Sequence, residues 1–174
     1  VIRASCDGFH RVRADRYERG RDSPEGYYHD SFDYQSIRSE LLAPLGPSGS
    51  GRYRSVAFDL DTDSPAHEPL RQAPPDCVLL FDGVFLLRPE LNDHWDFRVF
   101  VQVSFEEAVR RASIRDQSGS MSAGEVRARY WKRYVPGQRI YLETVEPELR
   151  ADVVVENNDL ENPELTVIDA PDAR

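Results

Sequence analysis

Two aspartates follow short apolar stretches of the sequence, and a glycine follows each of them. Asp7 comes after VIRASC, and Asp82 comes after CVLLF. An apolar strand that ends in an aspartate is typical of sites in which the carboxylate holds Mg²⁺, directly or through water. A second carboxylate at the same edge of a sheet could accept a proton from a hydroxyl group. Asp-Gly is also a common turn pair, so each aspartate taken alone indicates only a turn.

Arginines are the other groups that could do chemistry. Two expected helices carry several of them on either side of a Gly/Ser-rich segment, residues 117–124, that we expect to be flexible. Such a helix pair is typical of a lid that closes over phosphates. A solvated helix face that balances an acidic protein has the same pattern. The arginines are Arg110, Arg111, Arg115, Arg127, Arg129 and Arg133.

The segment GPSGSG at residues 46–51 has the glycine spacing of a Walker A phosphate-binding loop. Arg52 and Tyr53 stand where that motif has lysine and a Mg²⁺-binding hydroxyl. A working loop also lies between a buried strand and the start of a helix, whereas here a helix is expected before it and a strand after it. We therefore interpret GPSGSG as a flexible connector.

Apolar runs and capping residues predict an alternation of strands and helices. A helix is expected over residues 34–45 with Asp33 as its N-cap, and capping boxes begin two more at Ser104 and Ser122. Residues 11–30 read as loop, and Pro136-Gly137 as a helix break with a short helix continuing to Val145. The expected fold class is α/β, with a mostly parallel sheet flanked by helices. The expected strands are residues 1–5, 54–60, 77–83, 98–103 and 151–157, of which 77–83 reads as a strand buried on both faces and 98–103 as a similar one.

Bulk composition limits the classes of function. The chain of 174 residues is long enough for one domain with a core, and its net charge of -9 argues against broad nucleic-acid binding. No apolar run approaches the length of a membrane span. Cys6 and Cys77 form no C-x-x-C pair, so a reduced, cytoplasmic protein is expected. Oligomeric state stays open, a homo-oligomer included.

Five stretches, in order, resemble the uridine kinase family, a branch of the P-loop nucleoside and small-molecule kinases. They are CDGFH, YYHDSFDY, VLLFDGVFLL, RVFVQVSFEEAVRRASIRD and YVPGQRIYLETVEPELRADVVVEN. The resemblance covers residues 1–158 and leaves residues 159–174 as an acidic tail that we expect to be loosely held. It implies a P-loop NTPase-like fold with a helical, arginine-rich lid. It also implies phosphoryl transfer from ATP, with Mg²⁺, to a hydroxyl group of a nucleoside or a related small molecule.

The same resemblance implies roles for individual residues. Asp7 would be the general base and Asp82 would help to place Mg²⁺. Arg111 and Arg115 would embrace the triphosphate of ATP. The implied substrate-binding residues are His10, Tyr28, His29, Asp33, Phe58 and Arg129.

The chain departs from the family pattern in several places. The family's Walker A loop lies before the D-x-F-[YH] strand with which this chain starts, and we expect that it is truncated here. His10 stands where many members carry tyrosine, Arg129 where a base-reading glutamine is common, and Asp61 and Asp63 in a stretch where many carry histidine. Two alternatives stay open: a noncatalytic binding or regulatory domain on a kinase scaffold, and a kinase for pantothenate, ribulose phosphate or nicotinamide riboside.

Overall fold

The protein is seen in a computed structural model that describes residues 1–116 and 121–168. The chain divides into two compact units. The first contains residues 1–21 and 25–94, and the second contains residues 22–24 and 95–174. The predicted flexible segment 117–124 and the end of the predicted tail lie partly outside the described residues.

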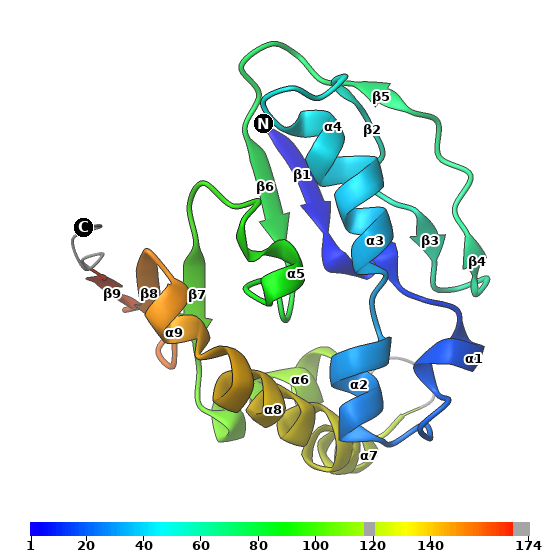
Figure 1. The fold of residues 1–174 in the computed structure, drawn as a ribbon. Coiled ribbons are helices and arrows are strands. Elements are labelled where there is room, and N and C mark those ends of the chain that lie inside the picture. Colours follow the sequence, from blue (N-terminus) through cyan, green and yellow to red (C-terminus); the bar gives the residue numbers. More distant parts are fainter. Residues whose placement is uncertain (117–120, 169–174) are drawn as a thin grey trace. The chain divides into compact units, whose positions relative to one another are not determined.

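The first unit is built on a pair of parallel strands. β1 (Ile2–Ser5) and β6 (Leu79–Asp82) run side by side, with Ile2 opposite Leu79 and Ser5 opposite Asp82 (Figure 1). A 3₁₀ turn, η1 (Cys6–Phe9), follows β1 directly. Two short antiparallel pairs complete the strands of this unit: β2 (Arg52–Tyr53) with β5 (Arg71–Gln72), and β3 (Phe58–Asp59) with β4 (Ser64–Pro65).

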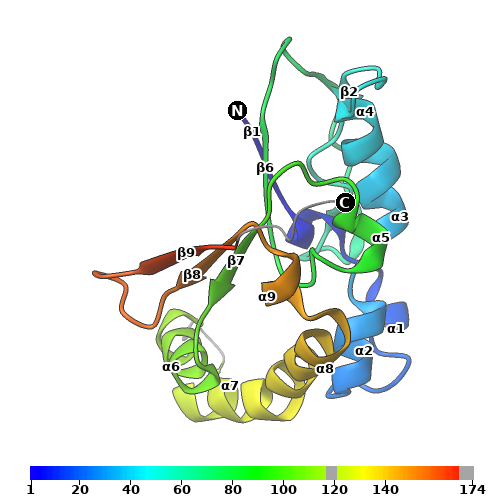
Figure 2. The same cartoon turned by 60° about the vertical axis from the view of Figure 1, so that its left-hand side comes forward.

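A helical stretch lies on one side of the β1–β6 pair (Figures 1 and 2). It consists of α3 (Tyr34–Ser36), the π-helical η2 (Ile37–Leu42) and α4 (Ala43–Leu45). The predicted N-cap is confirmed, because the Asp33 side chain accepts a hydrogen bond from the backbone amide of Ser36. Ile37 and Leu41 are fully buried. The remaining helices of this part of the chain are α1 (Arg13–Arg16), α2 (Pro24–Asp30) and α5 (Pro89–Asn92).

The second unit contains a three-stranded sheet with the order β7, β8, β9 (Figure 2). β7 (Val99–Gln102) pairs in parallel with β8 (Val153–Glu156), and β8 pairs antiparallel with β9 (Glu164–Val167). β9 therefore lies within the segment that was expected to be a loosely held tail.

The helices of the second unit begin where the sequence predicts. Ser104 caps α6 (Phe105–Arg115), and Ser122 with Glu125 forms a complete capping box for α7 (Ala123–Arg129). The expected break at Pro136-Gly137 is wrong. The π-helical η3 (Tyr130–Tyr134) leads directly into α8 (Val135–Val145), and Pro136 falls in the first turn of α8, where a missing amide hydrogen is tolerated. α9 (Pro147–Arg150) ends the helical part.

The α/β class is confirmed, but a mostly parallel sheet is not. The parallel pairs β1–β6 and β7–β8 belong to two separate sheets, and the other three strand pairings are antiparallel. The expected loop at residues 11–30 contains α1 and α2, and the expected strand at residues 54–60 is reduced to β3 at its far end. These segments are organised by contacts distant in sequence, such as the backbone bond from Arg54 to Glu40.

The expectation that residues 77–83 and 98–103 form strands buried on both faces is wrong. Alternate side chains along these two segments are more than half exposed: Val78 64%, Leu80 57%, Val99 52% and Val101 53%. Each of the two sheets therefore presents apolar side chains on one face. Among the described residues no helix combines the length and the apolar character needed to cross a membrane.

Candidate active site

The two predicted carboxylates lie at the same end of the β1–β6 pair. Asp82 is the last residue of β6 and stands opposite Ser5, and Asp7 follows Ser5 by two residues. Because the strands are parallel, their carboxyl ends meet at one edge, which is where ligands gather in open α/β sheets. The buried Cys6 thiol lies 3.9 Å from Oδ1 of Asp7. Burial raises its pKa to about 12, helped by the negative charges of Asp7 and Asp82, so the thiol stays protonated.

Glycines follow both aspartates because the backbone is crowded there. A Cβ on Gly8 would lie 3.0 Å from the carbonyl oxygen of Ser55 and 3.2 Å from Cα of Val56. Gly83 has φ +154°, and a Cβ there would lie 2.2 Å from the Sγ atom of Cys6. Each Asp-Gly pair therefore does more than turn the chain, because it lets a second segment approach the carboxylate closely.

His10 is held tightly beside Asp7. Its Nε2 atom lies 3.5 Å from Oδ1 of Asp7, and its Nδ1 atom lies 3.0 Å from the carbonyl oxygen of Ser31. The ring stacks on Phe32 at 4.6 Å between centroids. The side chain of His10 is 13% exposed, whereas that of Asp7 is 74% exposed. The Asp7 carboxylate is thus exposed to solvent, and the nearly buried imidazole of His10 lies beside it.

A cavity of about 670 Å³ opens at Asp7. Asp7 and Gly8 form part of its wall, and the β3–β4 hairpin forms much of the rest. Phe58, predicted as an aromatic wall, is buried and lines the cavity. The volume suits a ligand of nucleoside size. The other lining residues with ionisable side chains are Asp59, His67 and Glu68.

The hairpin that forms this wall is attached to α1 through Asp63. Its carboxylate accepts a hydrogen bond from the backbone amide of Arg13 at 3.0 Å and from the guanidinium of Arg16 at 2.9 Å. The Arg16 side chain is 10% exposed, and Asp63 itself has φ +52°. Asp63 is not among the residues that line the cavity. Asp63 therefore positions the β3–β4 hairpin by binding α1.

Three other residues predicted to bind substrate lie outside the cavity lining. Tyr28 is buried beneath Arg88, whose guanidinium carbon lies 4.3 Å from the centre of the tyrosine ring. The Asp33 carboxylate is occupied as a helix cap, with bonds to both the amide and the hydroxyl of Ser36. His29 is exposed and packs edge-on against Tyr28. Tyr28 and Asp33 thus contact Arg88 and Ser36 within the protein.

Arg111, predicted to bind triphosphate, is engaged within the second unit. Its guanidinium pairs with Glu107 at 2.7 Å and donates to the backbone carbonyls of Asn157 and Asn158. Glu107 also binds Arg110, and these two arginines lower its pKa to about 2. The Glu107 carboxylate therefore does not close the predicted capping box of α6, although Ser104 still caps the helix.

Arg115 and Arg129 also contact neighbours in the second unit. Arg115 binds the Asp116 carboxylate at 2.6 Å and the Tyr130 hydroxyl at 3.1 Å, and its positive charge helps to lower the pKa of Asp116. The guanidinium of Arg129 lies over the ring of Tyr134 at 5.4 Å. The arginine-rich helices thus carry ion pairs and cation–π contacts of their own.

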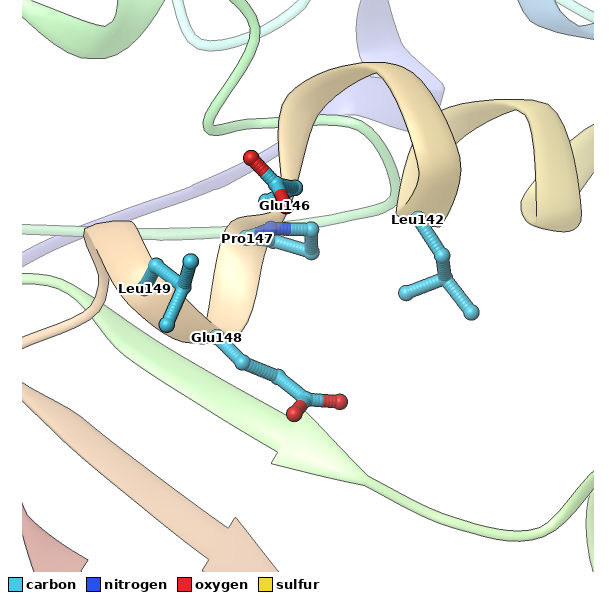
Figure 3. Close-up of a pocket in the computed structure, with 5 residues that line it drawn as sticks. All are labelled: Leu142, Glu146, Pro147, Glu148 and Leu149. Atoms are coloured by element: carbon cyan, nitrogen blue, oxygen red, sulfur yellow. The ribbon is translucent and has the colours of Figure 1, made fainter.

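A second hollow, of about 210 Å³, lies where α8 meets α9 (Figure 3). Leu142 and Leu149 border it together with Glu146 and Glu148. Figure 3 shows the Glu148 carboxylate pointing away from the α8–α9 turn, and Glu148 accepts a hydrogen bond from Gln102. The hollow is smaller than the cavity at Asp7 and lies in the unit that contains neither predicted catalytic carboxylate.

Sequence reasoning missed Arg88, a buried arginine that contacts two of the residues in this part of the chain, Tyr28 and Tyr34. It is 8% exposed, donates to the backbone carbonyl of Tyr28 at 2.6 Å and to Glu90 at 2.7 Å, and its guanidinium also lies over the ring of Tyr34. No spacing rule marks a single arginine after an apolar stretch as buried.

Comparisons with known proteins bear on the fold. The sequence matches no protein-family model and no curated protein. Among solved structures, the chain is similar to that of a possible uridine kinase from Bacillus stearothermophilus, with a TM-score of 0.65 and 25% sequence identity. The match covers 88% of this chain and 70% of the other. The chain therefore has a uridine kinase-like fold.

Proposed function

We propose that this chain carries the acceptor side of a site for phosphoryl transfer from ATP to a hydroxyl group of a nucleoside. The main support for this proposal is the position of Asp7, which lies at the carboxyl end of the parallel β1–β6 pair and also in the wall of the large cavity. The likeness to a possible uridine kinase supports a reaction of kinase type at the coarsest level. The substrate and the residue roles below are part of the proposal.

Asp7 is the general base in this proposal. Its exposed carboxylate would accept the proton of a substrate hydroxyl held at the cavity mouth. Phe58 would supply an apolar wall for the base or ring of the substrate. Phosphoryl transfer depends mostly on positioning and on neutralising charge, so a well-held acceptor hydroxyl is a large part of what a protein can contribute.

Asp82 fits a role in holding Mg²⁺. Its exposed carboxylate ends β6, and Mg²⁺ is commonly held by one or two carboxylates together with waters and substrate phosphates. Among the described residues, no three ionisable side chains of the metal-binding types gather into a full ligand set. Mg²⁺ would neutralise charge on the phosphates of ATP.

The proposed reaction also needs a phosphate-binding loop, and no such loop between a strand and a helix start is seen among the described residues. Residues 46–51, whose glycines have the matching spacing, connect α4 to β2 and so lack the required context. The discriminating observation is the roughly 30–40 codons upstream, which should encode a strand followed by G-x-x-x-x-G-K-[ST].

The cavity favours an uncharged or cationic substrate. The lining residues include three carboxylates, those of Asp7, Asp59 and Glu68, of which Glu68 pairs with Arg71 at 3.0 Å, and no arginine or lysine lines the cavity itself. The carboxylate of Asp59 is kept ionised, because the backbone amide of Asp61 and Thr62 donate to it and lower its pKa. Like charges repel, so pantothenate and ribulose phosphate are disfavoured, whereas uridine, cytidine and nicotinamide riboside are compatible.

The test is the variant Asp7→Asn in the full-length protein, assayed for ATP-dependent phosphorylation of a panel of these five compounds. Loss of the base should lower turnover by at least about 100-fold with nucleoside binding nearly unchanged. Asp93→Asn, which removes an exposed carboxylate after α5, is the matched control. Retained turnover in Asp7→Asn would remove Asp7 from the base role. Nucleoside binding with no transfer in the unaltered protein would instead support the noncatalytic binding domain.

A further inference from the structure

The contacts of His10 fix which of its nitrogens carries a proton. The Nδ1 atom lies 3.0 Å from the carbonyl oxygen of Ser31, and a carbonyl can only accept a hydrogen bond. Nδ1 must therefore be protonated. In the neutral ring, the Nε2 atom then has a lone pair, and that lone pair faces Oδ1 of Asp7 at 3.5 Å.

The side chains of His10 and Cys6 lie close to the Oδ1 atom of Asp7. The Cys6 thiol lies 3.9 Å from this atom, but that thiol stays protonated and can only donate. Asp82 adds a negative charge at the same end of the strands. The imidazole also contacts the ring of Phe32 and the backbone of Ser31, which carry no charge. The Nε2 atom of His10 is therefore a basic nitrogen that lies beside the proposed base.

The same geometry is held from several directions. The backbone of His10 forms an isolated β-bridge with Phe32, and the amide of Asp33 donates to the carbonyl of Phe9 at 2.8 Å. The amide of Arg11 shares the Ser31 carbonyl with the imidazole. With its ring stacked and nearly buried, His10 is preorganised with respect to Asp7.

We propose that His10 is a positioning residue that acts through Asp7 as a proton relay, instead of a residue that binds substrate. The proposal rests on the proposed function. The hydroxyl oxygen bonds to the γ-phosphorus of ATP as the bond from that phosphorus to the leaving oxygen of ADP breaks, and the hydroxyl proton passes to the Asp7 carboxylate. The proton then moves from Asp7 Oδ1 to His10 Nε2. The result is an Asp7 carboxylate and an imidazolium protonated at both nitrogens. After the product leaves, Nε2 releases the proton to water and the neutral ring is restored.

The relay has a chemical advantage. A carboxylic acid holds a proton weakly at neutral pH, so a proton left on Asp7 could return to the oxygen from which it came. An imidazole titrates much nearer to neutrality and can hold that proton until the product has left. Asp7 would meanwhile remain ionised, which favours a forward reaction.

The test compares His10→Asn with His10→Gln in the full-length protein. The asparagine amide can reproduce the Nδ1–H bond to Ser31 and lacks any atom in place of Nε2, whereas the glutamine amide reaches toward Asp7 but cannot accept a proton. Both variants should lower kcat at least about tenfold with KM changed by less than about threefold. His94→Asn, after α5, is the control.

Two results separate the relay from the proposed function. If Asp7→Asn abolishes transfer while His10→Asn keeps the native kcat, the relay is wrong and the function stands. Nitrogen NMR of the imidazoles needs no turnover, and it should show the Nδ1–H tautomer for His10, assigned by its disappearance in His10→Asn. An Nε2–H tautomer would overturn the relay whether or not the protein is a kinase.

Discussion

Asp63 offers a test of how the cavity wall is held in place. Its carboxylate joins the tip of the β3–β4 hairpin to α1, 47 residues away from Arg16 in sequence. Replacing it with asparagine leaves an oxygen that can still accept from the Arg13 amide but removes the negative charge that faces the Arg16 guanidinium. Asparagine also tolerates the left-handed backbone at this position, so no strain is added.

The magnitude follows from burial. Arg16 is nearly buried, and no described residue accepts a hydrogen bond from its Nε atom, so it depends heavily on Asp63. Removing one partner of a buried ion pair costs about 3–5 kcal/mol. The Asp63 side chain is 26% exposed, so water screens part of this interaction. We expect Asp63→Asn to lower the free energy of opening of this region by about 2–3 kcal/mol.

Amide hydrogen exchange is the appropriate assay because it reports on one region at a time. A loss of about 2.5 kcal/mol corresponds to roughly 60-fold faster exchange where local opening limits it. The amides of Arg13, bonded to Asp63, and of Ala66, bonded to Ala57 across the hairpin, should both accelerate. Asp61→Asn makes the same charge change two residues away at an exposed position and should alter exchange by less than about threefold.

Equal exchange in the two variants would refute the reasoning, because it would mean that the Arg16 contact contributes no more than an exposed charge. A second consequence is functional. If the hairpin loosens, affinity for the nucleoside should weaken while the chemistry at Asp7 is kept, so KM should rise with little change in kcat. A fall in kcat alone would place Asp63 in the chemistry instead.

Two further expectations concern the ion pairs that Glu107 and Arg88 form. Glu107→Gln should lower the melting temperature most above pH 4.5 and least near pH 2. The pKa of Glu107 is depressed to about 2 in the folded protein, so the stability that its carboxylate contributes is lost as pH falls through that window. Thermal unfolding followed by circular dichroism from pH 2 to 7 measures this, and a difference between variant and native protein that stays constant with pH would contradict it. Arg88→Lys should lower the free energy of unfolding, measured in urea, by about 2 kcal/mol. A lysine ammonium cannot both stack on the ring of Tyr28 and bind the Glu90 carboxylate with two hydrogen bonds, as the guanidinium does. A loss under about 0.5 kcal/mol would contradict this.

The elements that sequence predicts correctly are those set by neighbours along the chain. The strands β1, β6, β7 and β8 follow from apolar runs, and the helix starts at Asp33, Ser104 and Ser122 follow from side chains that reach an amide three residues on. Such bonds depend on a few consecutive residues, so a local pattern contains the whole interaction.

The hairpins and the buried arginines could not be predicted in this way. β3 and β4 are two residues long, and their position depends on the Asp63–Arg16 pair and on the bond from Ala57 to Gly8. Strands this short have no periodicity to detect, and the contacts that hold them join residues about 50 apart. The expectation that apolar runs mean burial on both faces failed for a related reason, since burial depends on what lies opposite.

The Asp-Gly pairs show why a turn and a site are hard to separate in a sequence. The turn interpretation treats glycine as a way to reverse the chain, but Gly8 and Gly83 are required because a neighbouring segment approaches where a Cβ would lie. At Gly8 that segment leads into the cavity wall, and at Gly83 it is Cys6, which lies directly before Asp7. The glycine therefore brings the partner to the carboxylate, and the turn and the proposed site are produced by the same packing. An alanine at Gly8 should consequently impair nucleoside binding before it unfolds the strands, because the contact it breaks belongs to the cavity wall and leaves the β1–β6 register untouched.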